Sequence, residues 1–478
     1  MPSGEERPEG VIRSHSIAGR HQYFARKGYR PSIPIGESAG GDAHRCDGSC
    51  IPRYGSPVRP DDIASPAPPT SGSDLRRILQ IQGLRALLYG FGSVLIGSAL
   101  ARAGYSDARV GLVLTAMLAG FAVASISVGT RGDRIGRRRL YAGLFVLMGM
   151  AGSVFALTRW LPALILASLT GTISVEANES GPITSLEQAM MPHAASSPEA
   201  RNRAFARYNA VAYLTGSIGA LAAGGPDFFR RFFPALPASQ RFLLAYPVIG
   251  LACAMLAIRL SPRVEAGEEL SPERRFPILR SKGTVARLAG LFAVDSLGGG
   301  FVVNAFVVFW FQRRFGASTE TMGVVFFVAG LLQSASSIAA GWLANRIGLL
   351  NTMVFTHLPS NVLLILVPFM PSLTAAVAVL LARFAISQMD VPARQAYVVA
   401  MVDPGERTAA AAYTNTARYV VRPVGPALGG WLSQTVARAA PFVAAGALKI
   451  VYDLALLATF RRVPLPDESG KPPARGAT

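Results

Sequence analysis

Apolar stretches of roughly 17 to 25 residues alternate with short polar connections from about Leu84 onward. A helix needs about 20 apolar residues to cross the hydrocarbon core of a bilayer, and its backbone hydrogen bonds must be satisfied internally. The pattern therefore predicts an all-α integral membrane protein with twelve transmembrane helices. The predicted spans are Leu84 to Ala101, Val110 to Val128, Leu140 to Leu157, Leu161 to Ser180, Tyr208 to Ala223, Phe242 to Ile258, Leu288 to Phe311, Met322 to Leu343, Met353 to Phe369, Leu373 to Ser387, Tyr413 to Leu432 and Phe442 to Phe460.

Polar segments divide the chain into two membrane halves. The residues before about Ser73 are rich in Gly, Pro, Ser and Arg and contain no apolar run of signal-peptide type, which indicates a disordered tail. A charged connection separates the sixth predicted span from the seventh. The predicted organisation is a tail at 1–78, a six-helix half at 79–260, a linker at 261–287, a second six-helix half at 288–462 and a tail at 463–478.

Composition agrees with a bilayer environment, because 51% of the 478 residues are hydrophobic and only 16% are charged. The net charge of +19 raises the alternative of nucleic-acid binding, but much of it lies in loops between the spans, where basic residues set membrane orientation. The loops of one side carry the clusters 131–139, 201–207 and 263–287, and the densest basic cluster of the other side is Arg230, Arg231 and Arg241. We therefore expect a multi-pass protein of the inner or plasma membrane, with both termini cytoplasmic and no nucleic-acid partner.

The second half repeats residues of the first at nearly constant separations. Pro198, Arg201, Ala204, Asn209, Gly219 and Gly224 recur 206 residues later, Gln188 and Ala189 recur after 207, and Gly129 and Gly136 recur after 212. Parallel repeats of six helices place a binding site near the middle of the membrane, between the halves, where rocking of the halves alternates access.

A glycine-flanked charged loop joins the second and third predicted spans, with the sequence GTRGDRIGRRR. It resembles the signature loop of the major facilitator superfamily in Gly129, Asp133, Arg134, Gly136, Arg137, Arg138 and Arg139. The resemblance covers about Leu84 to Phe460 and implies a transporter, with Asp133 facing the cytoplasmic start of the eleventh span. The equivalent segment of the second half is GWLANRIGLLN, which contains neither the aspartate nor three of the arginines of the first-half loop.

Three carboxylates in and after the fourth span lie within about 80° on one helical face, if the helix continues through Gly181 and Pro182. Glu176 and Glu179 are candidates for proton coupling, because intramembrane carboxylates mark ion routes. Glu187 is expected at the cytoplasmic end, where a salt bridge to the cluster Arg137 to Arg139 would latch the first half. Its repeat equivalent is Arg394, so the second half would hold a weaker latch.

Further polar residues inside the spans are expected to line the central cavity. Asp295 and Asp390 are the remaining proton-coupling candidates. The cavity candidates are Arg85, Tyr89, Asn304, Arg383, Asn415, Arg418 and Arg422. Arg418 and Arg422 have no local carboxylate on their helix, so their partner is either an anionic or zwitterionic substrate or a carboxylate of the first half. Lys449 and Asp453, four residues apart, are interpreted as a neutralised pair.

The predicted function is secondary active transport of a small molecule, coupled to protons, because the sequence has no Walker-type nucleotide loop. Efflux is preferred slightly to uptake of an organic anion or zwitterion. Thr170 aligns with Arg383, where drug exporters of the superfamily carry an arginine motif, and this departure weakens a multidrug role. A sensor with the same fold is the alternative class. An enzyme, supported only by His193 near Glu187, is not expected. We also expect no metal site at His44, Cys46 and Cys50, no cofactor and no oligomer.

Overall fold

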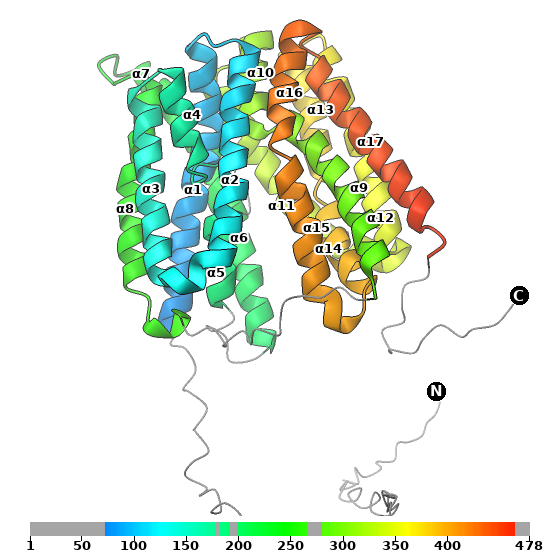
Figure 1. Cartoon of the computed structure of the whole chain (residues 1–478). Coiled ribbons are helices and arrows are strands. Elements are labelled where there is room, and N and C mark those ends of the chain that lie inside the picture. Colours follow the sequence, from blue (N-terminus) through cyan, green and yellow to red (C-terminus); the bar gives the residue numbers. More distant parts are fainter. Residues whose placement is uncertain (1–71, 177–180, 192–197, 266–279, 464–478) are drawn as a thin grey trace, which may run out of the picture. The chain divides into compact units, whose positions relative to one another are not determined.

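The computed structural model describes residues 72–176, 181–191, 198–265 and 280–463, all of which belong to the compact unit Pro66–Thr478 (Figure 1). Every regular element among these residues is helical, which confirms the all-α prediction. The first half comprises α1 (Gly72–Arg102), α2 (Asp107–Ile135), α3 (Arg137–Leu157), α4 (Leu161–Leu169), α5 (Pro182–Met190), α6 (Pro198–Ala222), α7 (Gly225–Arg230), η3 (Ser239–Leu244) and α8 (Ala245–Ile258). The second half comprises α9 (Lys282–Phe301), α10 (Asn304–Phe315), α11 (Thr319–Ile347), α12 (Leu349–Leu366), η5 (Val367–Phe369), α13 (Leu373–Ile386), α14 (Asp390–Ala400), α15 (Arg407–Val421), α16 (Val424–Thr435) and α17 (Ala440–Phe460).

Helix α1 begins inside the range predicted as tail. Asp74 is buried and accepts hydrogen bonds from the Ser261 backbone N–H at 3.3 Å and hydroxyl at 2.5 Å. This contact ties the first turn of α1 to the segment that follows α8.

Nine helical segments of the described residues are long and apolar enough to cross a membrane. The other predicted spans, the fourth, fifth and eleventh, correspond to α4 with α5, to α6, and to α15 with α16. These segments are interrupted or carry more polar residues, so length and hydropathy alone do not select them.

The fourth predicted span is broken in its middle, so the continuous helix on which a shared face of the three carboxylates depended is not present. Helix α4 ends at Leu169, Gly171 adopts a φ of +65°, residues 172–176 are not helical, and α5 begins at Pro182. A proline has no backbone N–H and disfavours a helical conformation in the residue before it, here Gly181. Glu176 and Glu187 therefore do not share one helical face.

The two halves repeat their backbone geometry at equivalent positions. Gly136 and Gly348 have φ values of +91° and +84°, and their N–H groups donate to the carbonyls of Gly132 and Ala344. Helix α1 packs on α6 as α9 packs on α15. A Cβ on Gly90 would lie 1.9 Å from the Gly216 carbonyl oxygen.

Gly300 makes the equivalent close approach in the second half, where a Cβ would lie 2.4 Å from the Arg422 carbonyl oxygen. The first helices of the two halves are thus related by an offset of 210 residues (300 minus 90). At this offset Arg85 corresponds to Asp295.

The halves meet at the end of the bundle that carries the α1–α2 connection, which we call the junction end. Here Gln312 on α10 donates to Ser98 on α1 at 2.7 Å, and Ser433 on α16 donates to Asp107 on α2 at 2.5 Å. Deeper in the bundle, Thr115 donates to the Pro423 carbonyl at 2.8 Å. The opposite end, which carries Gly136 and Gly348, is called the signature-loop end.

Replacing Gly136 with alanine is expected to lower the free energy of unfolding by about 1–3 kcal/mol, because a side chain is strained at this positive φ. The midpoint of thermal unfolding of the purified protein, followed by tryptophan fluorescence, measures the effect. The matched control is Gly129→Ala in α2, where an added Cβ would meet nothing within 4 Å. Equal midpoints for the two variants would contradict the prediction.

Candidate functional site

An ion pair joins the two halves in the middle of the bundle. Arg422 Nη2 lies 2.6 Å from Glu176 Oε1, and the two side chains are 18% and 27% exposed. Glu176 belongs to the non-helical segment that follows α4, and its backbone N–H donates to the Ser174 hydroxyl. The neighbouring Val175 carbonyl accepts from the Ala305 N–H of α10 at 3.2 Å. The break in the fourth span therefore brings a first-half carboxylate to a second-half arginine.

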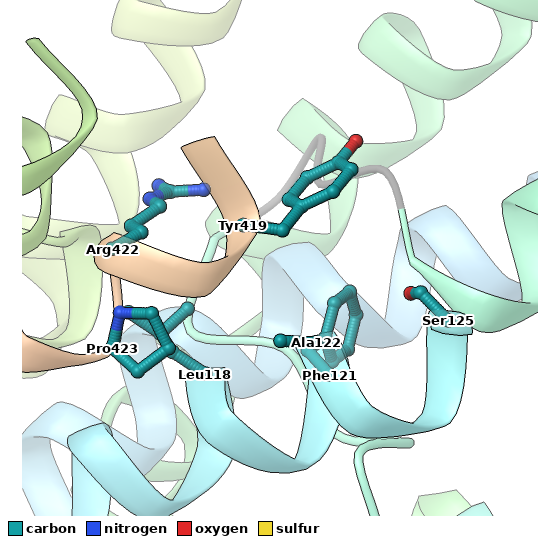
Figure 2. Close-up of a pocket in the computed structure, with 7 residues that line it drawn as sticks. All are labelled: Leu118, Phe121, Ala122, Ser125, Tyr419, Arg422 and Pro423. Atoms are coloured by element: carbon teal, nitrogen blue, oxygen red, sulfur yellow. The ribbon is translucent and has the colours of Figure 1, made fainter. Parts of the chain in front are cut away.

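Arg422 also lines a small pocket between α2 and the α15–α16 connection (Figure 2). Tyr419, Arg422 and Pro423 form one side of this pocket, and the other side consists of Leu118, Phe121, Ala122 and Ser125. The guanidinium thus borders a partly apolar hollow between the halves.

Asp295 is the centre of a buried cluster of charges inside the second half. Its carboxylate lies 2.6 Å from Lys449 Nζ, 3.1 Å from Arg394 Nη1 and 3.7 Å from Arg418 Nη2. Arg394 is also 3.4 Å from Asp390. The cluster draws on four helices, α9, α14, α15 and α17, and α14 supplies both Asp390 and Arg394, so residues far apart in sequence neutralise one another.

A polar triad lies directly beside this cluster. His357 Nδ1 is 2.8 Å from Asp453 Oδ1, Asn361 donates to Asp453 Oδ2 at 2.9 Å, and His357 Nε2 is 3.8 Å from Asp295 Oδ1. The predicted pairing of Lys449 with Asp453 is wrong, because Lys449 turns to the more central Asp295 and His357 takes its place. Among the described residues no three His, Cys, Asp or Glu side chains are grouped so as to hold a metal ion.

His357 was not among the residues predicted from the sequence to form the site. The signal was available, because a histidine and an asparagine four residues apart within an apolar span are unusual in a membrane interior. Both side chains are buried.

Three buried arginines retain unused hydrogen-bonding capacity. The Nε atoms of Arg85 in the first half and of Arg383 and Arg418 in the second half are buried and have no hydrogen-bond partner among the described atoms. The Arg383 guanidinium lies 5.1 Å from the ring centroid of Phe384. A buried donor without an acceptor is costly, so these positions favour an added acceptor.

Glu187 lies in the interior of the first half rather than beside the arginine cluster. It is fully buried, accepts from Arg85 at 2.7 Å and from the Tyr141 hydroxyl at 2.7 Å, and accepts from Tyr208. The expected contact with Arg137 to Arg139 is therefore wrong. Because α5 starts anew at Pro182, Glu187 points to α1, α3 and α6 and does not leave the bundle. Glu187 and Arg394 lie in different halves, each with its own partner.

The signature loop is anchored within the first half. Arg138 forms an ion pair with Glu265 at 2.7 Å and donates to the Leu260 carbonyl at 2.7 Å, while Arg137 approaches the carbonyls of Ala189 and Val264 at 3.5 Å. Arg134 and Arg139 are exposed. The Asp133 side chain and Glu179 lie outside the part of the chain that the structure describes.

The remaining predicted residues occupy different surroundings. Tyr89 donates to the Thr172 carbonyl of the non-helical segment at 3.1 Å, and its ring centroid lies 5.1 Å from the Arg85 guanidinium carbon. Asn304 is the first residue of α10, and Asn415 is exposed on α15. Tyr89 thus links the buried first-half pair to the broken span, whereas Asn415 is not part of either cluster.

The junction end holds a separate polar cluster outside the predicted spans. Arg102 forms an ion pair with Asp227 of α7 at 2.7 Å and donates to Thr319 of α11 at 3.3 Å. Burial opposes ionisation of Asp227, but hydrogen bonds from Ser239 and Thr319 and the Arg102 guanidinium outweigh it and hold the pKa below the ordinary 3.8.

The variant Glu187→Gln is expected to lower the free energy of unfolding by about 3–5 kcal/mol, because it leaves the buried Arg85 without its counter-charge. The double variant Arg85→Met with Glu187→Leu removes both charges and should lose much less. Unfolding midpoints of the wild type, of Arg85→Met, of Glu187→Leu and of the double variant test this. If the double variant lost as much stability as the two single variants together, the pair would not be coupled.

The junction end should stay closed between pH 8 and pH 5. A carboxyl with a lowered pKa keeps its stabilising contacts above its unfolded value and loses them only as pH falls through the lowered one, here below about 3.8. Spin labels at Arg109→Cys and Arg438→Cys, in a background without native cysteines, report the separation by pulsed electron resonance. Asp227→Asn should broaden the distance distribution at every pH. A wild-type distribution that shifts between pH 8 and pH 5 would contradict the prediction.

Comparison with known proteins agrees with this architecture. The family model described as Major Facilitator Superfamily matches residues 82–389 and 288–478. The curated protein "Uncharacterized membrane protein YJR124C" of Saccharomyces cerevisiae is 26% identical over 411 residues, which cover 79% of this chain and 92% of the yeast protein.

Solved structures show the same fold at low identity. The nucleoside transporter NupG is 12% identical with a TM-score of 0.61, and the alignment covers 81% of this chain and 99% of NupG. A D-xylose-proton symporter is 15% identical with a TM-score of 0.61, covering 83% and 99% of the two chains. A bacterial homologue of the human lysosomal transporter Spinster, in an inward-facing and occupied conformation, is 15% identical with a TM-score of 0.61, covering 82% and 96%. The resemblance carried by the signature loop is confirmed, and the chain belongs to the major facilitator superfamily of membrane transporters.

Proposed function

We propose that this secondary transporter of small molecules carries a small organic anion together with a proton. The observation that carries the proposal is the ion pair between Arg422 and Glu176, which is partly exposed at the centre of the bundle. Arg383 on α13 and Arg418 on α15 have buried Nε donors that lack acceptors among the described atoms. An anion would satisfy these donors and take the place of Glu176 on Arg422.

The balance of charge in the centre also favours an anion. Among the described residues, the central cations Arg383, Arg394, Arg418, Arg422 and Lys449 exceed the carboxylates Glu176, Asp295, Asp390 and Asp453 by one. A cation that is buried in a bundle normally meets a carboxylate or an anionic ligand. One bound negative charge would therefore neutralise the central site.

Competition for Arg422 determines the direction of coupling. A proton on Glu176 releases Arg422, and an anion on Arg422 leaves Glu176 free to accept a proton. Each ligand therefore strengthens the binding of the other, and this reciprocity holds whatever the order of binding. Positive linkage of this kind gives symport, so an inward proton gradient drives uptake. The ion pair between Arg422 and Glu176 thus favours uptake of an organic anion, whereas the sequence alone slightly favoured efflux.

The hydrogen bonds of the junction end support an orientation. If the basic signature-loop end faces the cytoplasm, as the distribution of arginines predicts, the described conformation is closed to the outside. Both termini would then be cytoplasmic, in the cell membrane. One chain supplies both partners of the central ion pair, so a monomer suffices for the cycle.

Proteoliposomes with an imposed pH gradient test the function. A panel of labelled mono- and dicarboxylates is offered, and internal pyranine reports proton movement. Wild-type protein should accumulate one or more of them with protons. Glu176→Gln should retain exchange of the anion but lose accumulation, and Arg422→Lys should raise the half-saturating concentration about tenfold, the equivalent of about 1.4 kcal/mol.

Matched controls make the same kind of change at an exposed charge of the same sign. Asp403→Asn and Arg313→Lys should leave accumulation and affinity unchanged, because both residues are exposed and outside the central clusters. Accumulation by Glu176→Gln at the wild-type level would refute the coupling role. Binding of an anion without flux would favour a sensor, and proton movement opposite to the substrate would favour efflux.

A further inference from the structure

Each half contains one buried ion pair between its first and fourth spans, and the signs of the two pairs are opposite. The repeat offsets of 210 and 207 relate Arg85 to Asp295 and Glu187 to Arg394. The first-half pair is 2.7 Å apart and the second-half pair 3.1 Å. The fold therefore accepts either polarity at this position.

The surroundings of the two pairs differ in chemistry. In the second half His357, Asn361, Lys449 and Asp453 adjoin the pair, whereas the equivalent first-half positions, at offsets of 212 and 206, are Phe145, Gly149, Leu243 and Pro247.

The equivalence of these positions is structural as well as sequential. A Cβ on Gly149 would lie 2.9 Å from Pro247, and the corresponding residues Asn361 and Asp453 are hydrogen-bonded. Apolar residues thus suffice at this site of the fold. Ionisable groups in a membrane interior are costly, so their presence in only one half indicates a function.

The hydrogen bonds of His357 define its tautomer. Nδ1 lies 2.8 Å from Asp453 Oδ1 and 3.2 Å from Asn361 Nδ2, and Asn361 makes its shorter contact, 2.9 Å, with Asp453 Oδ2. Because an ionised carboxylate accepts only, the shorter of the two Nδ1 contacts favours the tautomer with a proton on Nδ1. In the neutral ring, Nε2 then carries a lone pair. Nε2 faces Asp295 Oδ1 at 3.8 Å, which is too long for a hydrogen bond. A proton added at Nε2 would convert two facing acceptors into a donor and an acceptor.

We propose that His357 binds a proton at Nε2 during the transport cycle, and that the resulting imidazolium competes with Arg418 for Asp295. The inference rests on the proposed anion symport, because it assigns the freed Arg418 to the substrate. Among the described residues, the charged and titratable groups that face this network are Asp295 on α9, Asp390 and Arg394 on α14, Arg418 on α15, and Lys449, Tyr452 and Asp453 on α17.

Arg418 is the cation that a new partner would displace. Its distance to Asp295 is 3.7 Å, longer than those of Lys449 and Arg394. Its side chain is 28% exposed, and its buried Nε has no acceptor among the described atoms. Lys449 and Arg394 are buried and lie closer to Asp295 than Arg418 does, so they keep their ion pairs with Asp295. Protonation of His357 would thereby make the Arg418 guanidinium available to a substrate at the central site.

The first measurement follows the histidine itself. The chain contains five histidines, so full-length protein in nanodiscs, labelled with ¹⁵N only in histidine, gives few signals. Spectra are recorded from pH 8 to pH 5, and we expect one imidazole signal to respond to pH, to be absent in His357→Phe, and to be altered in Asp453→Asn. A His357 signal that does not respond to pH would overturn the proposal.

The second measurement follows Arg418. Modification by phenylglyoxal is quantified by mass spectrometry and expressed relative to exposed Arg313, which corrects for the intrinsic pH dependence of the reagent. The ratio should rise several-fold from pH 8 to pH 6 in the wild type and stay constant in His357→Phe and His357→Gln. His357→Phe places the residue of the first half at this site, and the glutamine variant keeps a polar side chain in case the first does not fold. A rise of equal size in both variants would overturn the proposal.

The two proposals can fail separately. Anion flux without protons, together with a His357-dependent change at Arg418, would overturn the proposed coupling and support the histidine switch. Proton-coupled flux whose pH profile is identical in the wild type, His357→Phe and His357→Gln would overturn the switch alone.

Discussion

A charge in the membrane interior needs a partner inside the protein, and this constraint organises the centre of both halves. In the first half the constraint is met locally, because Glu187 accepts from Arg85 and two tyrosines and is fully enclosed. In the second half Asp295 shares three cations, of which Arg418 is the most distant. Removing one partner of a buried pair leaves an uncompensated charge, so neither cluster can change its membership without a compensating proton or ligand. That requirement couples protonation to the position of the arginines.

The ion pair between the halves joins two interruptions of helical structure. Glu176 lies in the non-helical part of the fourth span, and Arg422 caps the end of α15 just before Pro423. The negative end of the α15 dipole stabilises the arginine there. Irregular backbone at membrane depth is tolerated where it is buried in protein or lines a cavity, as in other transporters with broken helices. Such segments can shift a side chain without moving a whole helix, which suits a contact that must break when the halves rock.

Periodicity and repeats in the sequence predicted the architecture, because both reflect local chemistry. Span lengths follow from bilayer thickness, and the paired Gly136 and Gly348 follow from a backbone conformation that favours glycine. The same reasoning failed where the outcome depended on tertiary contacts. Glu187 was expected beside the arginine cluster because the fourth span was treated as continuous, and the break before Pro182 turned the side chain inward. The pairing of Lys449 failed because a local i, i+4 spacing cannot reveal Asp295 on another helix.

The repeat offsets become informative only when combined with the structure. Sequence alone shows a change from glutamate to arginine between positions 187 and 394, which by itself resembles decay of a motif. The structure shows that the partner changes sign as well, from Arg85 to Asp295, so each position keeps a balanced pair. The difference between the halves is the histidine, amide, lysine and carboxylate that surround only the second pair. Since Asp227 at the junction end stays ionised throughout the physiological range, the proposed coupling assigns the effect of pH to the availability of Arg418 and Arg422 rather than to the closure of the junction end. In the proposed cycle, proton binding controls affinity for the anion first, and the movement of the halves follows from the altered occupancy.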